Sequence, residues 1–178
     1  MQDQFQRKID YLRISVTERC KYCMPVEEVQ WMPHESILSF EEILRLMRLS
    51  TQLGFRRFRI TRGEPLVRKG ILDFLREGAK LSGVEDLMIT TNGLLLPKMA
   101  FALKAAGVQR VNISLVTMNP EQYHPWGDVS SVIQGVFRSL EAGLNPVKIN
   151  VVVVRGLNTD ELPRFLTLAK QYLLLTCC

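Results

Sequence analysis

Two cysteines separated by two residues are the clearest chemical feature of this 178-residue sequence. Cys20 and Cys23 stand in the string TERCKYCMP, directly after an apolar run that ends at Val16. A C-x-x-C pair in a chain without a disulfide framework is typical of metal binding or redox chemistry. Taken alone, the pair leaves three interpretations open: half of a zinc site, a thioredoxin-like dithiol, or buried cysteines without chemistry.

The surroundings of the pair weaken the zinc and dithiol interpretations. A structural zinc ion needs four ligands, and His34 and His124 lack the spacing of a zinc motif. A thioredoxin-like motif opens a helix, whereas Pro25 follows the pair and indicates a loop. The remaining cysteines, Cys177 and Cys178, are adjacent and are expected to belong to a tail.

Length and composition predict a single domain, residues 1–178, because 47% of the residues are hydrophobic and can bury a sizeable core. The formal net charge of +5 favours anionic ligands and leaves nucleotides, nucleic acids and acidic surfaces open. No apolar run approaches the roughly 20 residues that span a bilayer, and the first residues lack the apolar segment of a secretion signal. We therefore expect a cytoplasmic protein, in which cysteines stay reduced.

Short β-branched runs alternate with longer segments of helical period, which is typical of repeated βα units. Ser39 and Glu42 form a predicted capping box at the start of the first helix, and Gly54 stands where that helix should end. The predicted strands are 11–16, 57–61, 86–91, 110–115 and 147–154. The further predicted helices are 69–81, 98–106, 129–142 and 160–172.

Each predicted strand has one apolar face and one polar face, and Arg13, Arg59 and Lys148 lie on the polar one. A parallel sheet covered by helices on both faces has nearly continuous apolar strands, so we expect helices on one face only. This predicts an α/β fold, a (β/α) barrel or part of one, with a cationic interior suited to a phosphorylated ligand. The alternative is a half-exposed sheet whose polar side chains are simply solvated.

Polar and glycine residues gather where the predicted strands end, and in a barrel these segments meet at one mouth. The segments are 17–23, 62–65 and 90–93, with Ser114 near the end of the fourth strand. Thiolates at such a mouth could hold a soft metal beside a ligand bound by the strand ends. The C-x-x-C pair is therefore predicted to lie next to a ligand site.

Several strings along the chain resemble a known family. The strings YLRISVTERC-KYCMP, RFRITRGEPLVRK, ITTNGLLL, RVNISL and NPVKINVVVVRGLN, in this order, are similar to the GTP 3′,8-cyclase family of radical S-adenosylmethionine enzymes. The resemblance implies an incomplete (β/α) barrel and a lyase of molybdenum cofactor biosynthesis, which converts GTP into a cyclic pyranopterin precursor by a radical reaction. It implies GTP as the substrate, and neither a nucleic acid nor a membrane as a partner.

The resemblance also implies cofactors and site residues. A [4Fe–4S] cluster bound through cysteine thiolates would leave one iron open for S-adenosylmethionine. The implied cluster ligands are Cys20 and Cys23. The implied contacts with S-adenosylmethionine are Tyr22, Gly63, Glu64 and Ser114. The implied contacts with GTP are Arg13, Arg59, Thr90 and Lys148.

The sequence departs from the family at several points. The family binds its cluster through C-x-x-x-C-x-x-C, whereas about four residues and one cysteine are missing around Cys20, so the predicted site is one thiolate short. Arg62 stands where the family has a glycine, and its side chain would crowd the amino acid end of S-adenosylmethionine. Val116 replaces a usual aspartate, and the family continues beyond this length.

These departures support a second hypothesis, a non-catalytic truncated remnant that binds a nucleotide without a working cluster. A third hypothesis is a zinc or dithiol protein that uses Cys20 and Cys23. A barrel that stops early exposes a sheet edge, and such an edge favours association, so a homo-oligomer is expected.

Overall fold

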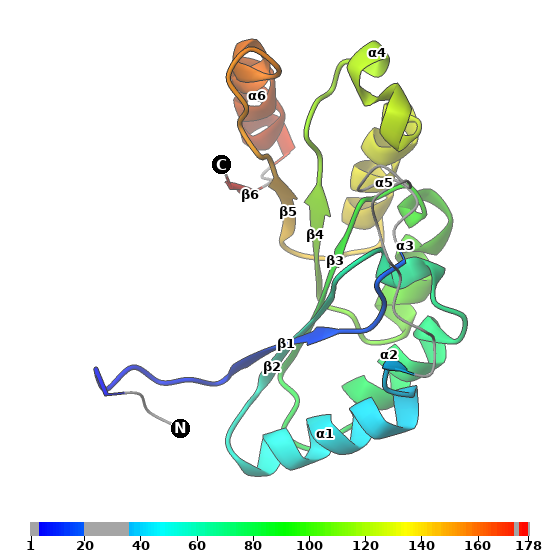
Figure 1. Ribbon diagram of the computed structural model, residues 1–178, viewed down its shortest axis with the longest axis vertical. Helices are drawn as coiled ribbons and strands as arrows, with labels where there is room; N and C mark the ends of the chain where they lie inside the picture. Colours follow the sequence, from blue (N-terminus) through cyan, green and yellow to red (C-terminus); the bar gives the residue numbers. More distant parts are fainter. Residues whose placement is uncertain (1–3, 20–35, 173–174, 178) are drawn as a thin grey trace.

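The computed structural model describes residues 4–19, 36–172 and 175–177, and these form one sheet of six parallel strands in chain order (Figure 1). The strands are β1 Tyr11–Ser15, β2 Arg57–Thr61, β3 Asp86–Thr91, β4 Arg110–Ser114, β5 Val147–Asn150 and β6 Leu175–Cys177. Parallel pairing of consecutive strands with a helix in each connection is the βα architecture that the sequence predicts, an incomplete (β/α) barrel.

Helices follow the strands in the predicted order. The α-helices are α1 Phe40–Gln52, α2 Ile71–Ala79, α3 Leu96–Ala105, α4 Pro120–Tyr123, α5 Val129–Glu141 and α6 Leu162–Tyr172. Short 3-10 helices are η3 Pro65–Val67, η4 His124–Trp126 and η5 Thr159–Glu161. Among the described residues, no helix is both long and apolar enough to cross a membrane.

The first helix begins at the predicted capping box. The Ser39 hydroxyl accepts from the Glu42 N–H at 3.2 Å, and the Glu42 carboxylate accepts from the Ser39 N–H at 2.8 Å. These bonds satisfy donors that a helix start leaves without intrahelical partners. Ile43 and Met47 then lie one turn apart on the buried face of α1, which packs on the sheet.

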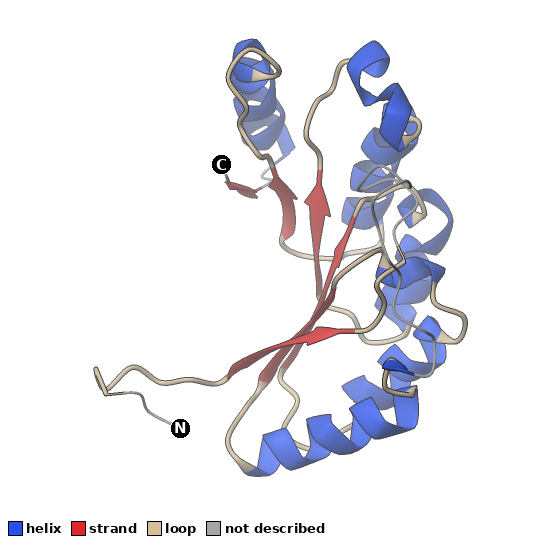
Figure 2. Ribbon diagram, viewed as in Figure 1, coloured by secondary structure: helices blue, strands red, loops and turns tan. Residues whose placement is uncertain are grey.

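One face of the sheet carries the hydrophobic core. Alternate strand residues point into it, and they are Phe58, Ile60, Leu87, Ile89, Val111, Ile113, Val147 and Ile149. Helices α1, α2, α3 and α5 lie along this face, and none of the helices in the described part of the chain lies across the opposite face of β1 to β4 (Figure 2). The prediction of one helix-covered face and one polar face is confirmed, and the polar face is the concave interior of the partial barrel.

The prediction of a long strand over 147–154 is wrong beyond Asn150, where β5 ends. The cause is Asn158, whose amide oxygen accepts from the Val154 N–H at 2.8 Å and whose amide nitrogen donates to the Val152 carbonyl at 2.8 Å. Local side-chain bonds of this kind compete with the strand ladder. The segment that leaves the sheet is apolar and exposed, and it includes Val152, which is 66% exposed.

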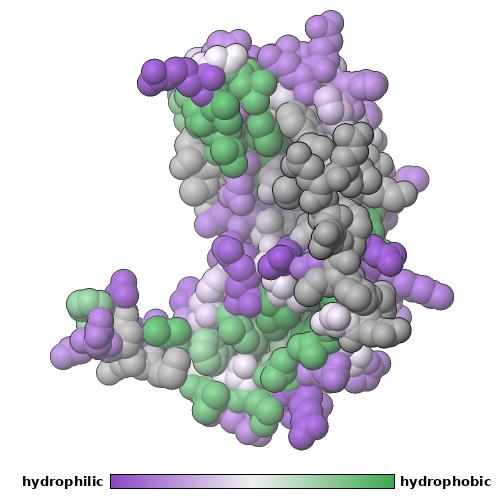
Figure 3. Space-filling model, viewed as in Figure 1, coloured by the Kyte–Doolittle hydropathy of each residue, from purple (hydrophilic) through white to green (hydrophobic). Residues whose placement is uncertain are grey.

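Hydrophobic side chains gather near the top of the molecule, over α6 and the segment after β5 (Figure 3). The exposed apolar residues in this part of the chain are Val152, Val153, Val154 and Leu166.

Candidate functional site

Basic side chains line the inner face of the sheet, and the strand register brings them into rows. Arg13 of β1 stands opposite Arg59 of β2, which stands opposite Met88 of β3. In the next row toward the strand ends, Asn112 of β4 lies between Thr90 of β3 and Lys148 of β5. The full set of inner-face cations in β1 to β5 is Arg13, Arg57, Arg59, Arg110 and Lys148.

Arg57 and Arg110 are neutralised by neighbouring carboxylates. Arg57 Nη2 lies 2.5 Å from Asp10 Oδ1, and this hydrogen bond lowers the pKa of Asp10 below its ordinary value. Arg110 Nη2 lies 2.5 Å from Asp86 Oδ2, and its Nε donates to Asp86 Oδ1 at 3.1 Å. A guanidinium held by a carboxylate through more than one nitrogen is geometrically fixed. These two arginines therefore have structural partners and are not available to an anionic ligand.

Arg59 has a different environment, because its neighbours carry no negative charge. Its guanidinium carbon lies 5.3 Å from the centre of the Tyr11 ring, and its Nη2 lies 3.9 Å from Met88 Sδ. With the Asn112 amide oriented so that oxygen faces the arginine, Asn112 accepts from Arg59 Nη1 at 3.2 Å. These contacts position the guanidinium and leave its charge uncompensated.

Arg13 and Lys148 likewise make no ion pair with any of the described residues. Arg13 is exposed and Lys148 is half-buried, both on the uncovered face. Ser114 lies one row nearer the strand ends, beside Asn150. The structure thus brings together, on adjacent strands, the positions predicted to contact GTP and the strand-end serine predicted to contact S-adenosylmethionine.

The turn after β2 packs tightly against the segment after β1. Gly63 has φ +57°, and a Cβ added there would lie 2.7 Å from the carbonyl oxygen of Arg19 and 2.8 Å from that of Thr17. The Glu64 N–H donates to the same Arg19 carbonyl at 2.9 Å. Glycine at this position is therefore required by close backbone approach as well as by positive φ.

Arg62 adopts φ +70°, a left-handed conformation that favours glycine. Its guanidinium lies 3.1 Å from the Glu18 carboxylate, so the side chain extends toward the segment after β1. The predicted crowding of S-adenosylmethionine by Arg62 stays a prediction.

Glu64 is buried, with 2% of its surface exposed, and its carboxylate serves as an acceptor for the ends of two strands. It accepts from Thr91 Oγ1 at 2.8 Å, from the Asn92 N–H at 2.7 Å and from the Leu66 N–H at 3.0 Å. The side chain thereby joins the turn after β2 to the end of β3. The predicted contact of Glu64 with S-adenosylmethionine is untested by this geometry, which shows a positioning function.

Burial makes the stability contribution of Glu64 depend on pH. Desolvation raises the pKa of Glu64 above its ordinary value of 4.5, so the folded state holds this proton more tightly than the unfolded chain does. The stabilising contribution of Glu64 is fully present below pH 4.5 and is lost as the pH rises through the folded-state pKa of Glu64. We expect wild type to gain stability relative to Glu64→Gln as the pH falls through the raised folded-state pKa of Glu64 toward 4.5.

Urea unfolding of wild type and Glu64→Gln at a series of pH values measures this difference, because the glutamine variant lacks the titrating group. A constant difference between the two proteins across the series would contradict the prediction.

Sequence reasoning missed two further charged residues at the same edge, the buried Glu161 and the half-buried Arg68. Glu161 is 5% exposed and accepts from Thr117 Oγ1 and from the Met118 N–H. Arg68 donates to the carbonyls of Val16 and Leu38. The available signal was a charged residue in the connection after a strand, but Thr117, the partner of Glu161, is 44 residues away and Val16, one partner of Arg68, is 52 residues away.

The predicted positions Cys20, Tyr22 and Cys23 lie outside the described residues. Within the ranges that the structure describes, no group of three or more His, Cys, Asp or Glu side chains could hold a metal ion.

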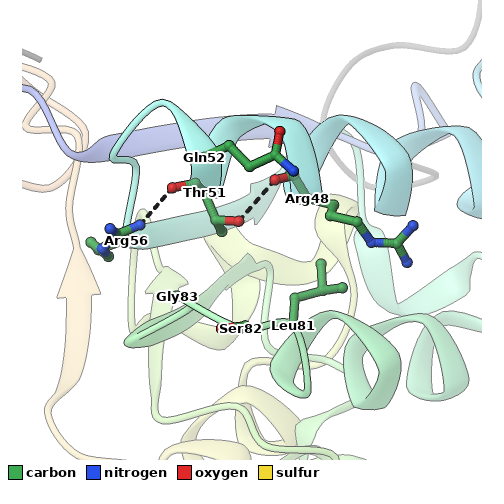
Figure 4. Close-up of a pocket in the computed structure, with 7 residues that line it drawn as sticks. All are labelled: Arg48, Thr51, Gln52, Arg56, Leu81, Ser82 and Gly83. Atoms are coloured by element: carbon green, nitrogen blue, oxygen red, sulfur yellow. Dashed lines mark hydrogen bonds between the residues drawn. The ribbon is translucent and has the colours of Figure 1, made fainter.

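A shallow hollow of about 420 Å³ lies at the opposite end of the sheet, where the strands begin (Figure 4). Its lining includes Arg56, whose Nη1 donates to the Thr51 carbonyl at 2.7 Å and so caps the end of α1. Arg48 also lines it, but the guanidinium groups of Arg48 and Arg56 lie on opposite sides of the hollow and do not converge (Figure 4). The candidate site therefore lies on the inner face and at the carboxyl ends of the strands.

This structure is a partial (β/α) barrel with polar residues at its strand ends. In folds of this class, ligands bind at the carboxyl ends of the strands. Residues 17–169 match the radical SAM superfamily. The chain therefore belongs to the radical SAM superfamily. Membership of this superfamily implies a [4Fe–4S] cluster and S-adenosylmethionine as cofactors.

Two curated relatives of the chain are both named GTP 3′,8-cyclase. The protein called GTP 3′,8-cyclase in Petrotoga mobilis is 50% identical over 175 residues, covering 94% of this chain and 54% of that protein. Its counterpart in Moorella thermoacetica is 48% identical over 178 residues, covering 96% of this chain and 55% of that protein. The chain spans about half the length of these curated relatives.

Solved structures support the fold. SuiB of Streptococcus suis bound to the precursor peptide SuiA superimposes with a TM-score of 0.72 at 16% identity, over 93% of this chain and 37% of SuiB. Coproporphyrinogen III oxidase (HemN) of Escherichia coli, described as a radical SAM enzyme, has a TM-score of 0.55 at 15% identity, over 91% of this chain and 41% of HemN. The prediction of a radical SAM type of partial barrel is confirmed.

Proposed function

We propose that this chain carries the nucleotide-binding inner face of a GTP 3′,8-cyclase, which converts GTP into a cyclic pyranopterin precursor. The observation that supports the proposal most directly is the division of the inner-face cations. Arg57 and Arg110 are paired with carboxylates, whereas Arg13, Arg59 and Lys148 make no ion pair with a described residue. The residues left uncompensated are the same cations that the family resemblance assigns to GTP.

The arrangement favours a ligand with several negative charges. Arg13 and Arg59 are neighbours on adjacent strands, and Lys148 stands across β4 from Thr90. Cations spread over one concave face attract a triphosphate from a distance and bind its oxygens directly. The Thr90 hydroxyl can donate to an oxygen of the same ligand. The inner face thus supplies charge and orientation, and the fixed guanidinium of Arg59 costs little ordering on binding.

The cofactor positions lie at the same edge of the sheet. Gly63 follows the end of β2 and Ser114 ends β4, which fits a cofactor bound across the strand ends. When bound, the cluster and S-adenosylmethionine would supply an adenosyl radical that abstracts hydrogen from the ribose of GTP. The thiolates of Cys20 and Cys23 would hold the cluster, with Tyr22, Gly63, Glu64 and Ser114 as the proposed contacts with S-adenosylmethionine.

Nucleotide affinity tests the proposal. We expect the protein to bind GTP, guanosine to bind far more weakly, and Lys148→Ala to lower the affinity for GTP about tenfold through the loss of one charge-assisted contact. Isothermal titration calorimetry measures these affinities. Lys98→Ala is the matched control, because Lys98 is an exposed lysine of α3 on the helix-covered face. Equal effects of the two substitutions would refute the proposed site.

A second candidate function is nucleotide binding without radical chemistry. The observation in its favour is the single C-x-x-C pair where the family has three cysteines. Iron and sulfide content after anaerobic reconstitution separates the candidates, since a working cluster holds about four irons per chain. Iron-free protein that still binds GTP would favour the second candidate.

A further inference from the structure

The ends of the two central strands are held by glutamates in the same way. At the end of β3, Thr91 Oγ1 donates to Glu64 and accepts from the Gly93 N–H at 3.1 Å. The next amide in the chain, that of Asn92, also donates to the Glu64 carboxylate. One glutamate thus binds a threonine hydroxyl and the following N–H, while the hydroxyl closes a tight turn. The glutamate comes from the segment after β2, the strand on one side of the central pair.

The same arrangement follows β4. Thr117 Oγ1 donates to Glu161 and accepts from the Asn119 N–H at 3.0 Å. The next amide in the chain, that of Met118, donates to the other carboxylate oxygen at 2.6 Å. This glutamate comes from η5, in the connection after β5, the strand on the other side of the central pair. Each central strand end is therefore clamped by a carboxylate from its outer neighbour.

The clamp after β4 is buried and is reinforced by a second side chain. Glu161 is 5% exposed, and Thr117 and Asn158 are fully buried. Asn158 Nδ2 donates to the Val116 carbonyl at 2.7 Å and to the Val152 carbonyl at 2.8 Å. Asn158 and Glu161, which both belong to the connection after β5, therefore hydrogen-bond to successive residues of the segment 116–118. Because buried polar groups of this kind have no water to replace a lost partner, their geometry is strongly specified.

We infer that Glu161 is a positioning residue for the nucleotide site, and this inference rests on the proposed function. Ser114 ends β4 only three residues before Thr117, and Lys148 belongs to β5. A ligand that contacts both strands requires their carboxyl ends to keep one relative position. The carboxylate of Glu161 holds that position by joining the connection after β5 to the turn after β4, and a small displacement of either strand end weakens ligand contacts.

The test compares substitutions that keep or remove the clamp. Glu161→Gln keeps the size of the side chain but replaces one acceptor oxygen by an amino group, so the single amide oxygen can accept from Thr117 Oγ1 or from the Met118 N–H but not from both. Thr117→Val keeps the shape of threonine but removes the hydroxyl, and it serves where Glu161→Gln does not fold. Each is expected to lower the affinity for GTP about tenfold. Thr117→Ser keeps the hydroxyl and is expected to restore nearly full affinity.

Ser139→Ala is the control for a general loss of stability. Ser139 is fully buried in α5, and its hydroxyl donates to the Gly135 carbonyl at 2.7 Å, on the helix side of the sheet. This variant should bind GTP as wild type does. Amide hydrogen exchange supplies a readout that does not depend on nucleotide, and the Met118 amide should exchange faster in Glu161→Gln than in Ser139→Ala.

The outcomes separate the two claims. Wild-type protein that does not bind GTP overturns the proposed function and the inference together. Wild-type binding with unchanged affinity in Glu161→Gln and Thr117→Val overturns the inference alone, and so does an equal loss of affinity in Ser139→Ala. A loss confined to the clamp variants, rescued in Thr117→Ser, supports the inference.

Discussion

Gly63→Ala is expected to lower the free energy of unfolding by about 3 kcal/mol, combining a backbone collision with positive-φ strain. A Cβ at this position would lie 2.7 Å from the Arg19 carbonyl oxygen and 2.8 Å from the Thr17 carbonyl oxygen. Both atoms belong to the backbone, so no side-chain rotation relieves the contact, and the segment after β1 must move. Urea unfolding followed by circular dichroism measures the loss.

Gly156→Ala is the matched control for this prediction. Gly156 has φ +79°, similar to the positive φ of Gly63, but a Cβ added there would meet nothing within 4 Å. Its substitution should cost only the conformational strain, about 1 kcal/mol. The excess loss in Gly63→Ala then measures the collision with the segment after β1. Equal losses in both variants would show that this close packing does not contribute to stability.

Arg68→Met is expected to lower the free energy of unfolding by about 2–3 kcal/mol, through lost charge-assisted hydrogen bonds and a lost cation–π contact. Arg68 donates to the Val16 carbonyl at 2.6 Å and to the Leu38 carbonyl at 2.7 Å. Its guanidinium also lies 4.0 Å above the Phe40 ring. The side chain therefore joins the two ends of the segment that carries the C-x-x-C pair.

Limited proteolysis distinguishes this role from a general stabilising one. Without the bridge, cleavage within residues 17–37 should accelerate more than cleavage elsewhere in the chain. Arg68→Lys should behave like Arg68→Met, because one ammonium lacks the planar fork that reaches both carbonyls. Arg45→Met, an exposed substitution on α1, controls for loss of surface charge. Uniform cleavage in all variants would argue against a bridging function.

Local sequence patterns predicted most of the architecture. The strands over 57–61 and 86–91 have the predicted bounds, and Ser39 begins the first helix as expected. Such features depend on neighbours a few residues apart, and the alternation of side chains along a strand is itself a local property. The failure after Asn150 has the opposite origin. A run of valines favours a strand, but Asn158 captures its backbone groups through contacts that strand propensity does not describe.

The candidate site was only partly predictable for the same reason. Alternation placed Arg13, Arg59 and Lys148 on one face, and the family resemblance assigned them to GTP. Neither could show that Arg57 and Arg110 are neutralised, since their partners depend on where other strands and the segment before β1 lie. An ion pair is decided by distances across the sheet, which a single strand does not contain.

The sequence by itself determined the alternating strands, the helix starts and stops, and the kinship with radical SAM enzymes, because these follow from residue type and short spacing. Only the tertiary structure decided which inner-face cations stay uncompensated and which glutamates hold the strand ends. Glu64 accepts a hydrogen bond from Thr91, 27 residues away in the sequence, and Glu161 accepts one from Thr117, 44 residues away. Those partners meet because parallel strands align their carboxyl ends at one edge of the sheet, and burial there makes each hydrogen bond obligatory.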